Sequence, residues 1–215
     1  MTIAFTKVKE PHGWLGNMSP YPIQCFGVEW RTTEALFQAL RFSDAAIREH
    51  IRSQKSPMGA KLAAKSKKEL MTTEPLSEQD VRNMNFCLNL KIKQHPSLQK
   101  LLLDTGYKKI VEDVTNRANR GSALFWGAAK TPEGTWEGQN HLGALWQNIR
   151  HVLKTSKILE PVLEGLTEFQ KRQVFAEDCN SSILMNIYGK ERVYKYTEGW
   201  EKEAKEWVQY ELCFE

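Results

Sequence analysis

The chain has little of what stabilises an extracellular or membrane-embedded protein. Its 215 residues include only four cysteines, Cys25, Cys87, Cys179 and Cys213, which lie far apart and form no C-x-x-C pair. Neither a disulfide framework nor a cysteine-rich metal site is expected, and reduced thiols in a cytoplasmic protein fit this spacing. No apolar run reaches the ~20 residues that a membrane-spanning helix needs, so we expect no membrane association. The opening MTIAFTKVKEPHGW lacks the apolar stretch of a secretory signal.

The sequence also lacks the motifs of several large enzyme classes. The P-loop G-x-x-x-x-G-K-[ST] and the dinucleotide fingerprint G-x-G-x-x-G are both absent. The nucleophile elbow G-x-S-x-G and the ligand spacing of zinc deaminases are absent too. These absences remove common nucleotide-dependent enzymes, serine hydrolases and zinc deaminases, and we expect neither a metal nor another cofactor.

What the chain does have is enough apolar sequence for a core and an uneven distribution of charge. Apolar residues make up 41% of it, too many for a disordered protein. Residues 1–154 carry 22 Lys and Arg against 14 Asp and Glu, a net charge of +8, whereas residues 155–215 carry 8 against 12, a net charge of −4. A basic body attracts anionic ligands, although charge spread over a surface also serves solubility alone.

Hydrophobic periodicity and capping residues predict an α+β fold dominated by helices, with a small β-sheet core. Strands are expected at 2–8, twice within 23–30 and at 110–114, and helices at 32–42, 44–52, from 56, at 77–94, 97–103 and 140–154. Ser77 and Asp80 have the spacing of a capping box, and the last helix should bury Leu142, Leu145, Ile149 and Val152. Weaker patterns predict strands at 183–188 and 193–196 and a helix at 198–210. Because the pattern weakens beyond Thr155, we expect a main domain of residues 1–154 and a C-terminal extension of residues 155–215.

The helix expected at 32–42 places a polar stripe beside an apolar one. Glu34, Gln38 and Arg41 follow one another at intervals of four and three residues. The helix dipole favours a carboxylate in the first turn, so this pattern alone is more typical of a solvated surface.

Two loops combine small, amide and aromatic residues. In GWLGNMSPYPI, Gly13 and Gly16 allow a ligand to approach the backbone and Asn17 can hydrogen-bond it, unless the loop is only a connection sealed by its aromatic residues. In FWGAAKTPEGTWEGQNHLGALW, Trp126 can stack on a base and Asn140 begins a helix whose free N–H groups suit a phosphate or ribose. The alternative makes Trp126 a core residue and Asn140 a helix cap.

In their order and spacing these segments resemble the NADAR superfamily of YbiA-like N-glycosidases. The resemblance covers about residues 5–154 and leaves the C-terminal extension outside. The matching positions are Leu15-Gly16-Asn17 (Leu-Ser-Asn in the family), Trp30, Thr33-Glu34, Gln38-Ala39, Phe42, Ser56-Pro57, Ala60-Lys61, Lys91, Leu102 to Gly106, Val111-Glu112, Trp126-Gly127, Gly138 to Gly143, and Arg150.

The chain departs from the family pattern at one position. The family usually has an aspartate three residues before the Trp-Gly pair, where this chain has Ala123, and the preceding loop TNRANRGSAL is longer. Glu112 or Asp113 is a candidate to supply the missing carboxylate. The departure favours a substrate other than that of YbiA.

The resemblance implies hydrolysis of an N-glycosidic bond to ribose, and it implies the roles of the site residues. Such reactions pass through an oxocarbenium-like state, which needs negative charge near the anomeric carbon and a proton for the departing nitrogen. We expect Glu34 to act on the ribose side and Lys91 to hold a phosphate or polarise the leaving group. The expected substrate-binding residues are Gly16, Asn17, Gln38, Phe42, Lys61, Glu112, Asp113, Trp126, Gly127 and Asn140.

Of the family's branches, the ADP-ribose-directed one fits better. We expect the chain to remove ADP-ribose from guanine in nucleic acid, with DNA favoured, in a DNA-repair or antitoxin role paired with an ADP-ribosyltransferase. One alternative is hydrolysis of phosphorylated riboflavin-pathway intermediates. Another is a non-catalytic ADP-ribose or NAD sensor, with Ala123 marking lost catalysis.

Overall fold

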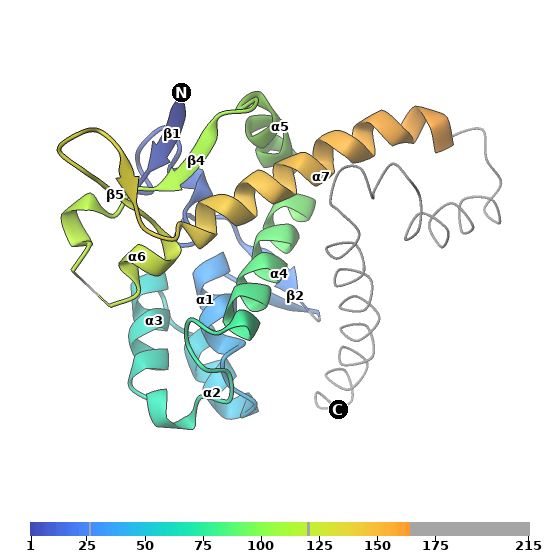
Figure 1. Cartoon of the computed structure of the whole chain (residues 1–215). Helices are drawn as coiled ribbons and strands as arrows, with labels where there is room; N and C mark the ends of the chain where they lie inside the picture. The colour runs from blue at the N-terminus through green and yellow to red at the C-terminus, as the bar shows by residue number, and fades with distance from the viewer. Residues whose placement is uncertain (26, 120, 164–215) are drawn as a thin grey trace. The chain divides into compact units, whose positions relative to one another are not determined.

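A computed structural model describes residues 1–25, 27–119 and 121–163 of the chain, and these form a helix-rich α+β fold. The helices are α1 (Thr33–Ala39), α2 (Ala45–Arg52), α3 (Pro57–Lys65), α4 (Glu78–Gln94), α5 (Pro96–Asp104), α6 (Ala123–Trp126) and α7 (His141–Leu163). Short 3₁₀ turns lie at Gly13–Leu15, Lys68–Leu70 and Thr115–Arg117. Figure 1 shows α1, α2 and α3 gathered at one end of the fold, and β1, β4 and α5 at the other. The predicted fold class is confirmed.

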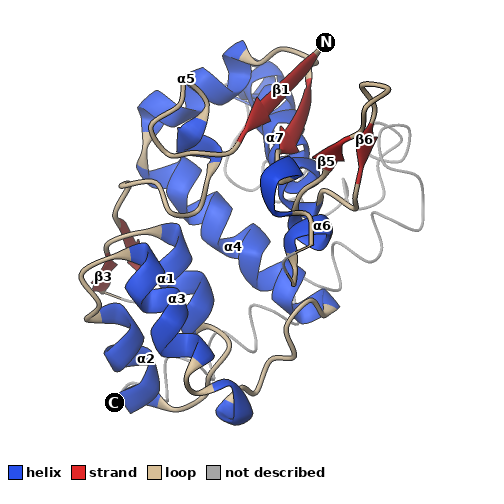
Figure 2. Cartoon of the chain, turned by 90° about the vertical axis from the view of Figure 1, so that its left-hand side faces the viewer, coloured by secondary structure: helices blue, strands red, loops and turns tan. Residues whose placement is uncertain are grey.

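The described strands pair in three small sheets. β1 (Thr2–Phe5) runs parallel to β4 (Lys109–Glu112), so Ile3 aligns with Ile110. β2 (Ile23–Cys25) and β3 (Val28–Trp30) form an antiparallel hairpin, as do β5 (Ala129–Lys130) and β6 (Trp136–Glu137). Figure 2 shows β1 far from the helices α1 to α3, with α4 between them. The sheets are therefore small parts of a mainly helical body.

Capping residues explain where the helices begin. Thr32, Asp44, Ser56 and Ser77 each accept a hydrogen bond from the backbone N–H three residues later, which satisfies a donor that the first turn leaves free. Pro57 and Pro96 occupy the first turns of α3 and α5, where a missing N–H does no harm. The helix starts expected near Asp44, Ser56 and Ser77 are therefore confirmed.

Four expectations about the helices need correction. α1 ends at Ala39, before Phe42, and α7 continues past Lys154 to Leu163. Val152 is 42% exposed, so the buried face of α7 stops short of it. Only half of the capping box forms, because the Asp80 carboxylate accepts from Arg41 and Leu76 instead of turning back to Ser77. The elements expected at 183–210 lie outside the described residues.

The core joins the helices to the N-terminal loop. Trp146 of α7 is fully buried, donates its indole N–H to Leu15 O at 2.9 Å and meets Trp14 edge-on, with ring centroids 6.0 Å apart. Leu88 of α4 and Leu102 of α5 are also fully buried. Residues distant in sequence thus fix the loop that follows β1.

No helix in the described part of the chain combines the length and apolarity needed to cross a membrane.

Candidate active site

A cavity of about 160 Å³ lies where β1, the N-terminal loop, α1 and the end of β4 meet. Seven predicted site residues line it: Gly16, Asn17, Glu34, Gln38, Lys61, Glu112 and Trp126. The other lining residues were not among the predicted site residues; they are Phe5, Thr6, Val8, Met18, Phe37, Arg41, Met84, Val114, Arg117, Ser122, Ala123 and Leu142. The cavity therefore brings together residues that lie far apart in the sequence, from Phe5 to Leu142.

The polar stripe of α1 faces this cavity and not solvent. Every residue of α1 is buried, and Glu34 is only 6% exposed. Gln38 Nε2 donates to Glu34 Oε1 at 2.9 Å, and Arg41 donates from Nη1 to Gln38 Oε1 at 3.0 Å. Arg41 also forms a bidentate pair with Asp80 of α4, at 2.8 and 2.7 Å. Glu34 thus ends a row of side chains that reaches into the core.

Glu112, at the end of β4, is the second carboxylate of the cavity. Arg117 forms an ion pair with it at 2.6 Å, and the Glu112 side chain is 17% exposed. Burial raises the pKa of Glu112 and the charge of Glu34 adds to the rise, while Arg117 and Lys61 act in the opposite direction. The two carboxylates therefore interact electrostatically, and Glu112 favours the protonated form more than an exposed glutamate does.

Asn17 offers the cavity a polar atom that no described residue satisfies. The residue is 8% exposed, and its Nδ2 lies 2.9 Å from Met84 Sδ, a weak acceptor. Its Oδ1 is buried without a hydrogen-bond partner among the described residues. An unsatisfied buried acceptor is unfavourable, so a ligand hydroxyl or N–H that reached Oδ1 would gain a full hydrogen bond. The backbone O of Asn17 accepts from Glu34 N at 3.0 Å, which ties the loop to α1.

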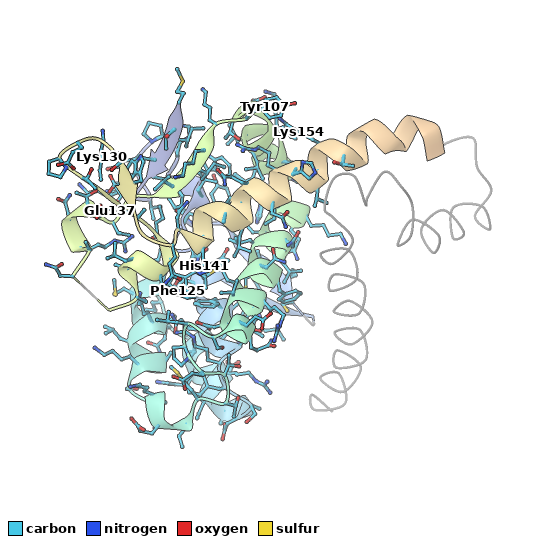
Figure 3. All side chains as sticks on the ribbon, in the orientation of Figure 1. Tyr107, Phe125, Lys130, Glu137, His141 and Lys154 are labelled. Carbon is cyan, nitrogen blue, oxygen red and sulfur yellow. The ribbon has the colours of Figure 1, made fainter. Side chains whose placement is uncertain are left out.

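Aromatic residues form the wall beside these polar groups. Trp126 of α6 meets Phe37 of α1 edge-on, with centroids 5.6 Å apart. Phe125 meets Trp126 edge-on, with centroids 5.0 Å apart, and lies against His141 of α7, with centroids 4.2 Å apart (Figure 3). Ala123, one turn earlier on α6, lines the cavity with a methyl group, at the position where the sequence resemblance predicts a carboxylate. Trp126 therefore presents an aromatic surface to the cavity.

Lys91 does not line the cavity, although the sequence made it a catalytic candidate. Its side chain is fully buried, and Nζ donates to Trp14 O at 2.5 Å, Gly16 O at 3.1 Å and Ser19 Oγ at 2.7 Å. No carboxylate of the described residues pairs with it, and burial lowers the pKa of Lys91 to about 7. The ammonium therefore holds the loop that carries Asn17, and it does so from the core and not from the cavity.

Four predicted binding residues also lie outside the cavity lining. Asn140 has φ 53° and uses its amide to bond β4, donating to Ile110 O at 2.9 Å and accepting from Glu112 N at 3.1 Å. Asp113 accepts from the backbone and the hydroxyl of Thr115. The remaining two are Phe42, a core residue 1% exposed, and Gly127, where a Cβ would collide with Glu112 O.

Gly13 also has a structural reason for being glycine. A Cβ there would collide with the backbone oxygens of Lys7 and Val8. The close approach that the sequence suggested for a ligand is thus made by the chain itself.

Comparison with known proteins gives consistent results. A family model described as the NADAR domain matches residues 4–154. The N-glycosidase YbiA of Escherichia coli K12 is 34% identical over 157 residues, which cover 72% of this chain and 90% of that protein. The riboflavin biosynthesis protein VVA0006 of Vibrio vulnificus is 28% identical over 155 residues, or 71% of this chain and 38% of that protein. The NMR structure of E. coli YbiA aligns with a TM-score of 0.61 at 31% identity, covering 73% of this chain and 87% of that one.

Proposed function

The chain belongs to the NADAR domain family, and from this membership we propose that it is an N-glycosidase that removes ADP-ribose from guanine in nucleic acid, DNA above RNA. The observation that carries the proposal is the pair of carboxylates, Glu34 and Glu112, in one cavity with an aromatic wall. Glycoside hydrolysis needs two such groups, one that stabilises the cationic sugar and one that moves a proton.

The two carboxylates suit different steps because their surroundings differ. Water adds to the anomeric carbon as the bond to nitrogen breaks, and the departing nitrogen takes up a proton. Glu34 supplies negative charge for the oxocarbenium-like state and accepts the proton of the attacking water. Glu112, whose pKa burial raises, donates a proton to the departing nitrogen. Both groups return to their starting protonation states when one proton passes back through solvent.

The rest of the cavity suits an anionic nucleotide. Lys61 and Arg117 line it and supply positive charge for a phosphate group. Trp126 offers a stacking surface for a base, and Asn17 Oδ1 can accept from a ribose hydroxyl or an amino group. Ala123 supports a substrate different from that of relatives with an aspartate at this position. Lys91 does not contact the substrate in this scheme.

A second candidate is hydrolysis of a phosphorylated riboflavin-pathway intermediate, which is favoured by the similarity to the V. vulnificus riboflavin biosynthesis protein. The deciding experiment gives the purified chain an oligonucleotide carrying ADP-ribosylated guanine and, separately, the phosphorylated riboflavin intermediate. We expect release of ADP-ribose from the first substrate at a much higher kcat/KM. Preferred turnover of the second would replace the proposal with the alternative. Tight binding of ADP-ribose without turnover of either would make the protein a sensor.

A cytoplasmic location and a functional pairing with an ADP-ribosyltransferase belong to the same proposal. Both follow from the substrate, because guanine-linked ADP-ribose must be made by a transferase where nucleic acid is present. Co-expression with such a transferase should restore growth if the chain reverses its product, and failure to do so would speak against the pairing.

A further inference from the structure

Four polar side chains form a continuous row from the core to Glu34. Asp80 of α4 is fully buried and holds Arg41 through Oδ1 to Nε at 2.8 Å and Oδ2 to Nη2 at 2.7 Å. Arg41 Nη1 reaches Gln38 Oε1 at 3.0 Å, and Gln38 Nε2 reaches Glu34 Oε1 at 2.9 Å. We call this row of Asp80, Arg41, Gln38 and Glu34 the relay.

The chemistry of the relay permits only one direction of donation. An ionised carboxylate such as Asp80 only accepts, and a guanidinium such as Arg41 only donates. Gln38 must therefore turn its oxygen toward Arg41, which leaves its NH₂ group to donate to Glu34. Oε1 of Glu34 is thus held as an acceptor. No described residue donates to Oε2, so Oε2 is the oxygen left to act on a ligand in the cavity.

The buried end of the relay is anchored more firmly than an ion pair alone would require. Leu76 has φ 66°, an unfavourable backbone for a residue with a side chain, and its N–H donates to Asp80 Oδ2 at 2.9 Å. The backbone O of Arg41 accepts from Thr72 N at 2.8 Å and from Thr73 N at 3.2 Å. The Arg41 guanidinium lies over the Phe37 ring, 4.5 Å from its centroid. These contacts fix both partners of the ion pair.

We propose that Asp80 is a positioning residue that orients the catalytic carboxylate Glu34 through Arg41 and Gln38. The proposal rests on the proposed role of Glu34 and adds three residues that act through it. Its physical basis is that a catalytic oxygen displaced by a fraction of an ångström loses much of its effect, so its supports contribute to kcat. The sequence offered no sign of this, since Asp80 lies 39 positions from Arg41 and looked like a capping residue.

The test is a double-mutant cycle between the two ends of the support, Asp80→Asn and Gln38→Met, measured as kcat on the N-glycoside that the wild type turns over. Each single change should lower kcat about tenfold, with KM changing less, because the reacting oxygen is displaced. Since Gln38→Met already breaks the relay, adding Asp80→Asn should lower kcat no further. If the losses multiply instead, Asp80 acts independently of Gln38 and the proposal is wrong.

Ser77→Ala is the matched control. It removes the cap from the same helix turn, where Ser77 Oγ accepts from Asp80 N at 3.2 Å, and leaves the bonds to Arg41 in place. We expect the melting temperature to fall while kcat stays near that of the wild type. A fall in kcat as large as that of Asp80→Asn would show that loss of stability, and not of the relay, explains the data.

A second readout needs no substrate, so it separates this proposal from the proposed function. The side-chain NH₂ of Gln38, labelled with ¹⁵N, should exchange its hydrogens slowly while Arg41 holds the amide. In Asp80→Asn the exchange should accelerate about tenfold or more, and in Ser77→Ala it should not. Unchanged exchange in Asp80→Asn would overturn the relay even if the enzyme is active. Accelerated exchange in a chain whose Glu34→Gln variant keeps full activity would support the relay and refute the catalytic role of Glu34.

Discussion

The two carboxylates of the cavity, Glu34 of α1 and Glu112 of β4, have very different supports. The ion pair that supports Glu34 through Gln38 is buried: the Asp80 side chain is 0% exposed and that of Arg41 is 10% exposed. Glu112 is held by one ion pair with Arg117. The Arg117 side chain is 41% exposed and comes from the loop between β4 and α6. An exposed ion pair contributes little, whereas a buried charge left without its partner is strongly unfavourable. The position of Glu34 is therefore fixed by buried contacts, whereas that of Glu112 depends on a contact that solvent reaches.

Replacing Glu112 tests the less firmly supported of the two carboxylates, with the largest expected effect. If Glu112 protonates the departing nitrogen, Glu112→Gln should lower kcat about 100-fold. Wild-type activity should also decline as pH rises through the raised pKa of Glu112, because the acid must be protonated, and this decline should vanish in the variant. Both effects are measured as kcat/KM against pH.

The control for Glu112 is Arg117→Met, which leaves the carboxylate in place. Arg117 lowers the pKa of Glu112, so its removal should move the alkaline decline to higher pH while kcat falls only a few-fold. A decline that stays in place in both variants would assign it to another group.

Lys91, which holds the loop that carries Asn17, should make the stability of the protein depend on pH. The folded protein holds Lys91 with a pKa of about 7, against 10.5 for an ordinary lysine. Between these values the unfolded chain binds one proton more than the folded chain, so the free energy of unfolding must rise with pH. We expect a rise of up to about 1.4 kcal/mol per pH unit above pH 7 relative to Lys91→Met. Urea unfolding between pH 6 and pH 9 measures it, and parallel curves for the two proteins would contradict it.

Ala123→Asp adds a third carboxylate to the cavity, at the position where the sequence resemblance predicts an aspartate. A further negative charge near Glu112 should repel an anionic substrate and lower kcat/KM for ADP-ribosylated guanine about fivefold, the effect of roughly 1 kcal/mol at a partly screened site. Ala123→Asn has the same size without the charge and should lose less. Equal losses in both variants would make the effect steric.

The sequence predicted local structure well where the cause is local. Caps at Asp44, Ser56 and Ser77 fixed the helix starts, and the spacing of Glu34 and Gln38 correctly placed them on one helix face. The length of α7 could not be predicted, because the hydrophobic pattern weakens after Lys154 while the helix continues.

The site was harder to predict because it depends on contacts between distant segments. Lys91 has the residue type of an active-site cation, yet its direction is set by carbonyl groups more than 70 positions away. Asn140 resembled a ligand-binding amide and instead bonds β4. Arg117 is only five positions from Glu112, but it gave no signal because the 3₁₀ turn Thr115–Arg117 that brings them together was not predicted. Residue types indicated the chemistry, and tertiary contacts decided which residues take part.

We propose that Glu34 is the catalytic carboxylate of an N-glycosidase that acts on ADP-ribosylated guanine. The most direct measurement is the rate of ADP-ribose release from a modified guanine oligonucleotide by the wild type and by Glu34→Gln, which keeps the shape of the side chain. We expect the variant to be slower by about 100-fold or more at an unchanged melting temperature. Release by Glu34→Gln at the wild-type rate would rule out this role of Glu34.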